Sequence, residues 1–296
     1  MEHVFTIAVK DFYLEHILES GQVFRWHKLA QNFYLLYSGS KVSLVKQDQI
    51  ASLQIAVQNP ENLAYWKNFF DLQTDYELIK KSIGRRGKKV MREACEYGFG
   101  LRIARQDYFE TLIAFIISAN NNMKRIQRSM LLLSELYGKK IEMPEHFLAL
   151  LPDEYKGIEL YAFPEATDLA QVEPKELRAL AGVGYRDVNI AQSAKMVASG
   201  ISLEALDKLS SPKLLEALQN FAGVGPKVAA CIGLFAYHRT NAFPVDVWIK
   251  RTMQRLYLNE SASPKAIERE GQRRFGRYSG IAQQYLFYYA KELDKR

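Results

Sequence analysis

The sequence predicts an α+β fold, in which an antiparallel β-sheet subdomain over residues 1–100 packs on a mostly α-helical core over residues 101–296. Two observations support this. Residues of high β-propensity gather in short runs before residue 60, and from about Glu61 the apolar residues recur at helical spacing. The length of 296 residues also favours two or three packed subdomains over one compact core.

The strands are expected first. Residues 33–47 form two β-rich runs around the Ser38-Gly39-Ser40 turn, and residues 52–58 favour a third strand. Amphipathic patterns then predict three helices, which also belong to the first subdomain. They cover residues 61–70, 75–83 and 87–98.

After residue 100 the pattern is helical, with almost no strand signal. Residues 110–122 predict a buried helix that ends in a run of three asparagines, and residues 124–138 predict an amphipathic helix. The tetrapeptide Ala-Gly-Val-Gly occurs twice, at residues 181–184 and 222–225, each time after a leucine-rich helix. Three closing helices are expected within residues 244–257, 263–276 and 279–293.

The second Ala-Gly-Val-Gly lies in a segment, residues 211–238, that predicts a helix-hairpin-helix. Pro226 suits the first turn of the second helix, where no backbone N–H is needed. Gly223 and Gly225 allow the hairpin backbone to approach a phosphate closely, and the free N–H groups of the new helix favour an anion. The hairpin is therefore predicted to bind a DNA phosphate.

Lys227 is the candidate nucleophile. It lies in the first turn of that helix, where the positive end of the helix dipole favours a neutral amine. Cys231 follows one turn later on the same face, and Asp246 follows 19 residues after the lysine at a predicted helix N-cap. Singly, each has an ordinary explanation as a solvated charge, a core thiol or a cap. Together they predict an active site in which Asp246 faces an electron-poor sugar carbon.

Composition narrows the function classes. The net charge of +7 and pI of about 9.1 favour a polyanionic partner. Two cysteines exclude a disulfide framework and a four-cysteine iron–sulfur cluster, and five histidines without a nearby cysteine argue against zinc, so no metal or cofactor is expected.

The longest apolar run is too short to span a membrane, and no targeting signal opens the chain. A cytoplasmic, prokaryotic protein is expected.

At this point the chain resembles the helix-hairpin-helix DNA glycosylases that carry a Gly/Pro-rich loop and a catalytic aspartate, and within them the 8-oxoguanine branch. The resemblance covers nearly the whole chain. Besides the hairpin, the matching motifs are SGQVFRW (residues 20–26), LRIARQD (101–107), SANNNMKR (118–125), AGVGYR (181–186), PVDV (244–247) and GIAQQYLF (280–287).

The resemblance implies that the target nucleotide is extruded from the duplex. Asn120 matches the asparagine that fills the vacated space. Arg125 and Arg186 match the arginines that read the opposite cytosine, and Tyr185 matches the aromatic wedge beside it. The expected partner is therefore duplex DNA with 8-oxoguanine opposite cytosine, bound by a monomer.

The same resemblance assigns the base pocket. Cys231 and Phe287 match the two walls that sandwich the flipped purine, and Gln283 matches the amide that binds its pairing edge. Gly21 matches the glycine whose carbonyl accepts the hydrogen that oxidation adds to a ring nitrogen. Lys227 would attack the sugar while Asp246 stabilises developing positive charge, and the resulting Schiff base would allow strand cleavage by β-elimination.

Two alternatives remain open from the sequence. One is an alkylated-purine glycosylase of the same fold, although such enzymes need no lysine nucleophile. The other is a nonenzymatic helix-hairpin-helix DNA-binding protein. The sequence departs from the family at Trp248, where a histidine is frequent, and at Tyr108, where a proline often follows RQD. Two basic stretches, residues 80–89 and 272–277, suit either DNA backbone contacts or a solvated face.

Overall fold

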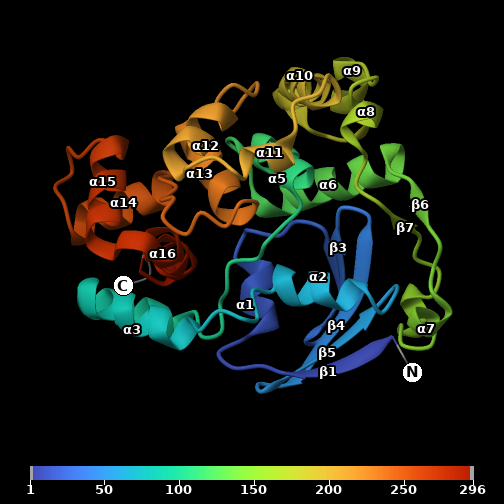
Figure 1. Cartoon of the computed structure of the whole chain (residues 1–296), viewed down its shortest axis with the longest axis horizontal. Helices are drawn as coiled ribbons and strands as arrows, with labels where there is room; N and C mark the ends of the chain where they lie inside the picture. Colours follow the sequence, from blue (N-terminus) through green and yellow to red (C-terminus); the bar gives the residue numbers. More distant parts are fainter. Residues whose placement is uncertain (1–2, 294–296) are drawn as a thin grey trace.

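The structure is a computed structural model that describes residues 3–293. It consists of a β-sheet subdomain and a larger helical layer that lies against it (Figure 1). The predicted α+β class, with an antiparallel sheet before a helical core, is confirmed.

The sheet has five antiparallel strands in the order β1-β5-β4-β3-β2. The strands are β1 (Val4–Ala8), β2 (Trp26–Ala30), β3 (Phe33–Ser38), β4 (Lys41–Gln49) and β5 (Ser52–Val57). The three predicted strands are its centre. The sequence did not predict β1 and β2, which form the edges and include several partly exposed residues.

One face of the sheet is covered by α1 (Leu14–Glu19) and α2 (Asn62–Phe69). A separate apolar core lies between this face and the two helices. Tyr34 and Ile55 from the strands are fully buried in this core with Trp66 and Phe70. Burying such large side chains stabilises the subdomain by about 2 kcal/mol each.

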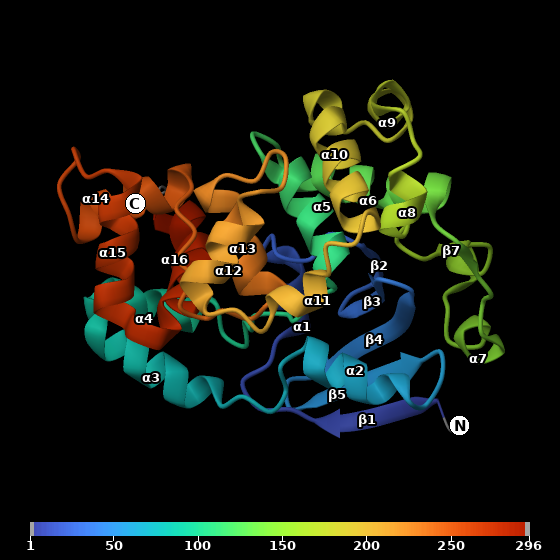
Figure 2. The same cartoon turned by 45° about the horizontal axis from the view of Figure 1, so that its top comes forward.

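Two helices of the first hundred residues pack elsewhere. These are α3 (Tyr76–Arg86) and α4 (Lys88–Tyr97), which lie against α15 (Pro264–Phe275) and α16 (Ser279–Leu293) at one end of the helical layer (Figure 2). Their buried residues join the main core of the helical layer rather than the core under the sheet. The predicted boundary near residue 100 stays a prediction.

The helical layer otherwise follows the predicted order. Its first helices are α5 (Tyr108–Ser118) and α6 (Met123–Tyr137), and several mostly short elements follow, of which α10 is the longest. These are α7 (Glu145–Leu148), η1 (Asp153–Tyr155), α8 (Ala166–Leu169), α9 (Pro174–Leu180), η2 (Gly184–Arg186), α10 (Asp187–Ala198) and α11 (Leu203–Leu206). The layer closes with α12 (Ser211–Leu218), α13 (Pro226–Phe235), α14 (Val247–Leu256), α15, η3 (Gly276–Tyr278) and α16. A small two-stranded sheet, β6 (Lys140–Ile141) with β7 (Leu160–Tyr161), was not predicted, because strands of two residues carry no periodic signal.

A buried ion pair ties the two layers together. Arg25 donates to the Glu110 carboxylate at 3.0 Å and to the carbonyls of Gly39 and Tyr161 at 3.2 and 2.6 Å. The Gly39 N–H donates to the same carboxylate at 2.7 Å. Because Gly39 takes part as both donor and acceptor, these contacts fix the first turn of α5 relative to the β3–β4 turn. Removing either charge would leave the other buried and unpaired.

Candidate active site

The hairpin between α12 and α13 has the predicted geometry. Gly223 lies in the left-handed region with φ of 78°, and a Cβ there would come within 2.5 Å of the Asn189 side chain on α10. Gly225 has extended backbone, and a Cβ there would meet nothing within 4 Å. Within the described chain, the N–H groups of both glycines donate to no acceptor. The hairpin therefore presents unpaired donors in open space, just before the N-terminus of α13.

Pro226 is the first residue of α13, as predicted, and Lys227 follows it. The Lys227 Nζ lies 5.8 Å from the centre of the Phe115 ring, which is itself stacked on Phe235 at 5.3 Å. The amine is partly buried against aromatic surface. This places it between solvent and the apolar core shared by α5 and α13.

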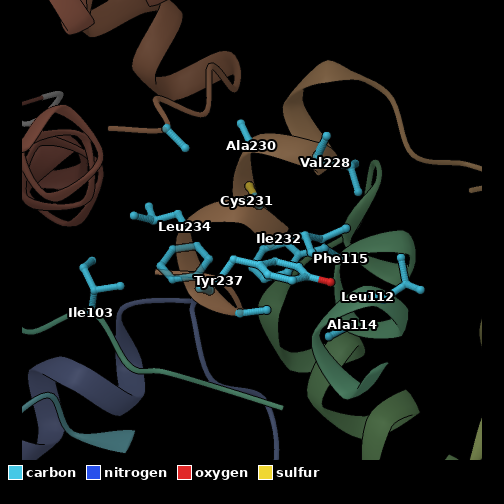
Figure 3. Close-up of a cluster of buried hydrophobic side chains, with 14 of the residues drawn as sticks. Ile103, Leu112, Ala114, Phe115, Val228, Ala230, Cys231, Ile232, Leu234 and Tyr237 are labelled. Carbon is cyan, nitrogen blue, oxygen red and sulfur yellow. The ribbon is translucent and has the colours of Figure 1, made fainter. Parts of the chain in front are cut away.

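Cys231 lies one turn after Lys227 and is buried in this same core (Figure 3). Burial raises the pKa of its thiol, and the Lys227 charge opposes that shift without overcoming it. A protonated, buried thiol is a poor nucleophile. Cys231 is therefore suited to form an apolar wall, which agrees with the role that the resemblance implies.

Asp246 caps α14, as predicted. Its Oδ1 accepts from the Ile249 N–H at 2.7 Å. Burial raises the pKa of this carboxyl, whereas the cap hydrogen bonds and the Lys227 charge lower it by less. Lys227 and Asp246 are thus close enough to interact electrostatically, and each lies at the N-terminal end of a helix. An amine and a carboxylate in these positions can act on one substrate together, the amine as a nucleophile and the carboxylate as a negative charge near an electron-poor carbon.

The predicted base-pocket residues come from distant parts of the chain. Gly21 has φ of 80°, and a Cβ there would lie 3.5 Å from the Phe287 ring of α16. Gln284 donates from Nε2 to the Ser20 carbonyl at 3.0 Å, which holds the loop of Gly21 against α16. The structure therefore brings Gly21 and Phe287 together across more than 260 residues.

Gln283 lies one turn before Phe287 and is 5% exposed. Its Oε1 has no hydrogen-bond partner among the described residues. An unpaired buried acceptor costs about 1–3 kcal/mol, so this amide oxygen is suited to a ligand donor.

Met123 is a pocket residue that sequence reasoning missed. Its Sδ would lie 2.9 Å from a Cβ at Gly21, nearer than the Phe287 ring, and its side chain is 37% exposed. It is the first residue of α6, directly after the asparagine run. Its position between the matched residues Asn120 and Arg125 was the signal available in the sequence.

A second group of predicted residues lies where α5 ends. Asn120 is exposed with φ of 50°, a left-handed conformation that asparagine tolerates better than most residues. Tyr185 is 59% exposed, and its hydroxyl donates to the Ala119 carbonyl at 3.2 Å. Asn120 and Tyr185 therefore project from adjoining turns.

Arg186 differs from expectation in its surroundings. It is buried, and its guanidinium donates to the carbonyls of Ala119 and Asn120, each at 2.9 Å, and of Val183 at 3.1 Å. Arg125 is exposed in the first turn of α6, and its guanidinium has no partner in the described chain. In this structure the Arg186 guanidinium is bonded to the Asn120 turn, whereas that of Arg125 is exposed; the roles predicted for both arginines stay predictions.

The two departures from the family pattern are local. Tyr108 begins α5 after the Asp107 cap, so a proline is not required there. Trp248 is 39% exposed in the first turn of α14, with the Arg251 guanidinium 5.9 Å from its ring centre. Within residues 3–293, no group of three His, Cys, Asp or Glu side chains is arranged to hold a metal ion. No described helix is long and apolar enough to cross a bilayer.

Comparison with known families gives two matches that together cover most of the chain. Residues 4–112 match the N-terminal domain of 8-oxoguanine DNA glycosylase, and residues 113–277 match the HhH-GPD superfamily of base excision DNA repair proteins.

Relatives of known structure align along nearly the full length. The 8-oxoguanine glycosylase/lyase of Clostridium acetobutylicum, solved with duplex DNA containing cytosine opposite 8-oxoguanine, is 36% identical with a TM-score of 0.87, over 99% of this chain and all of that one. MBOgg1, solved with a low-affinity DNA ligand, is 35% identical with a TM-score of 0.90, over 99% of this chain and 96% of that one.

A further relative is similar in sequence. A probable N-glycosylase/DNA lyase of Methanothermobacter thermautotrophicus is 27% identical over 96% of this chain and 95% of its own length.

Proposed function

The chain belongs to the HhH-GPD superfamily of base excision DNA repair proteins, as an 8-oxoguanine DNA glycosylase, and from this premise we propose that it excises 8-oxoguanine opposite cytosine and then nicks the strand. The observation that supports this most is the position of Lys227 and Asp246 at the N-terminal ends of α13 and α14, where the Lys227 charge lowers the pKa of the Asp246 carboxyl, together with a buried Gln283 oxygen on α16 that has no partner among the described residues.

The reaction begins when the lone pair of the Lys227 Nζ attacks the anomeric carbon of the flipped nucleotide. The glycosidic bond breaks, and its electron pair leaves with the base, which takes up a proton. The Asp246 carboxylate stabilises the positive charge that develops on the sugar. Lys227 is thereby joined to the sugar C1′, and the proton that its nitrogen loses passes to the departing base. The nitrogen lone pair then breaks the bond from C1′ to the ring oxygen, which takes a proton from water, and the opened sugar is a protonated Schiff base of Lys227.

Strand cleavage follows from that intermediate. Loss of a proton from the sugar C2′ expels the 3′ phosphate with the electron pair of its C–O bond. The nick therefore forms 3′ to the lesion, and no metal or redox cofactor takes part.

Selection of the base would rest on three contacts. The Gln283 Oε1 accepts from the pairing edge of a guanine-type base, and Phe287 with Cys231 encloses its faces. The Gly21 carbonyl accepts the extra ring hydrogen of 8-oxoguanine, whereas unmodified guanine would place two acceptors against each other. Arg125 and Asn120 would contact the unpaired cytosine.

The alternatives differ in measurable products. Duplexes with 8-oxoguanine, an alkylated purine or no lesion should show base release with strand cleavage only for the first. Borohydride should trap a covalent complex with the wild type and with Lys213→Gln, but not with Lys227→Gln; Lys213 is an exposed lysine on α12, the first helix of the helix-hairpin-helix. Trapping by Lys227→Gln would refute the assignment of the nucleophile. Release of the alkylated purine without cleavage would favour the other glycosylase class.

A cytoplasmic location and a monomeric state belong to the same proposal. The mass of 34.0 kDa sets the expectation for size-exclusion chromatography, and elution as a dimer would refute the monomer.

A further inference from the structure

Two short segments contain the whole net charge of the protein. Residues 85–93 and 269–277 together hold nine Lys and Arg against two Glu, whereas the other 278 residues hold 31 basic and 31 acidic residues. The formal charge of +7 is therefore concentrated in these eighteen residues, here called the basic junction.

The fold brings the two segments into contact. Arg274 donates to the Arg86 carbonyl at 3.2 Å, although 188 residues separate them. The Tyr257 hydroxyl donates to the Gly87 carbonyl at 2.5 Å, and the Lys88 and Arg274 cations lie 5.8 and 4.2 Å from the centre of its ring. Both segments lie where α3 meets α15, at the end of the helical layer away from α10 (Figures 1 and 2).

Most of these cations are not neutralised. Glu270 pairs with Arg273 and Arg274, and Glu93 with Lys89. The remaining cations are exposed or nearly so and make no ion pair within the described residues. These are Arg85, Arg86, Lys88, Arg92, Arg269 and Arg277.

The arrangement also costs stability. Lys88 has φ of 62°, a left-handed conformation that is unfavourable for a residue with a Cβ. Lys88 and Lys89 begin α4, whose first turn has no acidic residue and no side-chain cap. Cations at that end of a helix are repelled by its dipole. An ordinary solvated surface does not require such placements, and strained positions are typical of functional ones.

We propose that the basic junction binds the phosphates of a second segment of duplex DNA, while the first segment occupies the candidate active site. Dispersed Lys and Arg side chains bind phosphates without reading sequence. Asp246 is the N-cap of α14, and Tyr257 follows the last residue of that helix. The candidate active site and the basic junction are therefore separated by the length of α14, about 15 Å. The inference goes beyond the proposed function and does not depend on which base is excised.

A bridging experiment tests it. A short duplex with a stable abasic-site analogue is immobilised, the protein is bound, and capture of a labelled undamaged duplex is measured. The wild type should capture the second duplex. The variant Arg85→Gln/Arg86→Gln/Lys88→Asn/Arg92→Gln should not, and its binding of undamaged duplex should lose about 3–4 from the salt-dependence slope, at roughly 0.9 per phosphate contact. Asn is used at residue 88 because it tolerates a left-handed backbone.

The matched control removes four positive charges from the sheet side, as Lys46→Gln/Lys67→Gln/Lys140→Gln/Lys156→Gln. It should capture the second duplex as the wild type does, and all three proteins should excise the lesion from the short duplex equally. Equal loss in both variants would mean that net charge alone acts, and would overturn the proposal. Undiminished capture by the junction variant, or preferred capture of poly-glutamate at equal charge, would overturn it too. Capture without excision would refute the proposed function and leave the second site standing.

Discussion

The two Ala-Gly-Val-Gly turns have the same four residues and different structures. In the first, Gly182 and Gly184 are both left-handed, with φ of 65° and 63°, and the chain enters the short η2. In the second, only Gly223 is left-handed, and Gly225 leads directly into α13. The residues that follow make the difference. Pro226 starts a helix at once, whereas Arg186 finds acceptors on the α5 end.

This difference decides where the hydrogen-bond donors point. After the first turn, the donors of Tyr185 and Arg186 are used on the Ala119 and Asn120 carbonyls, within the protein. The backbone N–H groups of the glycines have no partner among the described residues in either turn, so the two turns differ in these side-chain contacts. The first turn is therefore held against the end of α5, whereas the second is the turn proposed to bind a DNA phosphate. Four experiments test this distinction.

The largest effect is expected beside the second turn, for Asp246→Asn. Asparagine keeps the cap and removes the charge, so single-turnover excision should fall by about 10²–10³. Because burial raises the pKa of Asp246, wild-type activity should fall as pH drops through a range above that of ordinary aspartates, and the variant should lose this limb.

Stability should change in the opposite direction. A raised native pKa means that the folded protein binds the proton more tightly, so wild-type stability falls as pH rises through that range. Asp246→Asn should unfold at higher temperature than the wild type at neutral pH. A less stable variant would show that the carboxylate is needed as a cap, and that its buried negative charge does not destabilise the folded protein.

The next effect separates the two arginines. Arg186→Ala leaves the Asn120 carbonyl without its donor and the Ala119 carbonyl with the Tyr185 hydroxyl alone, and it should cost about 1–3 kcal/mol of unfolding free energy. Arg125→Ala should change stability by no more than about 0.5 kcal/mol, because its guanidinium has no partner. It should instead reduce the preference for cytosine about tenfold, measured as excision opposite each of the four bases. The reverse pattern would make Arg186 the reader and the first turn a binding surface.

A smaller effect distinguishes the glycines. Gly225→Ala should leave stability unchanged, since its Cβ meets nothing, yet weaken DNA binding by obstructing the approach of the phosphate, with the salt-dependence slope unchanged because no positive charge is removed. Gly182→Ala should cost about 1–2 kcal/mol because of its left-handed backbone, with DNA affinity retained. Thermal unfolding and salt titrations measure both. Equal affinity losses would erase the distinction between the turns.

The smallest effect is expected for Met123→Ala. Loss of its contact with Gly21 should lower 8-oxoguanine excision about threefold to tenfold, with unchanged stability. Leu136→Ala is the control, since Leu136 lies at the far end of the same helix and is 42% exposed. A decrease in both variants would indicate a general disturbance of α6.

The sequence predicted the class, the central strands, the hairpin and the N-cap at Asp246, because these depend on local signals. Pro226 and the two glycines set backbone geometry whatever surrounds them. The edge strand β2 and the strand pair β6–β7 were not predicted, because the partner strand and not their own pattern makes them strands.

The missed parts of the site depend on tertiary contacts. Met123 reads as an ordinary helix-start residue until Gly21, about a hundred residues earlier, is seen against it. The inward orientation of Arg186 depends on carbonyls at the end of a helix far away in sequence. The roles assigned to the site residues stay predictions.

The contact between Asn189 and Gly223 has one more consequence. Asn189 lies in the first turn of α10, the helix that follows Tyr185 and Arg186. Its amide fills the space where a Cβ of Gly223 would be. Ser193, one turn further, donates to the Ala222 carbonyl at 3.4 Å. The helix that follows the first turn thus serves as a rigid spacer against the second. The distance between the residues proposed to contact one DNA strand and the amine proposed to attack the other is consequently fixed by contacts within the protein itself, whether or not DNA is bound.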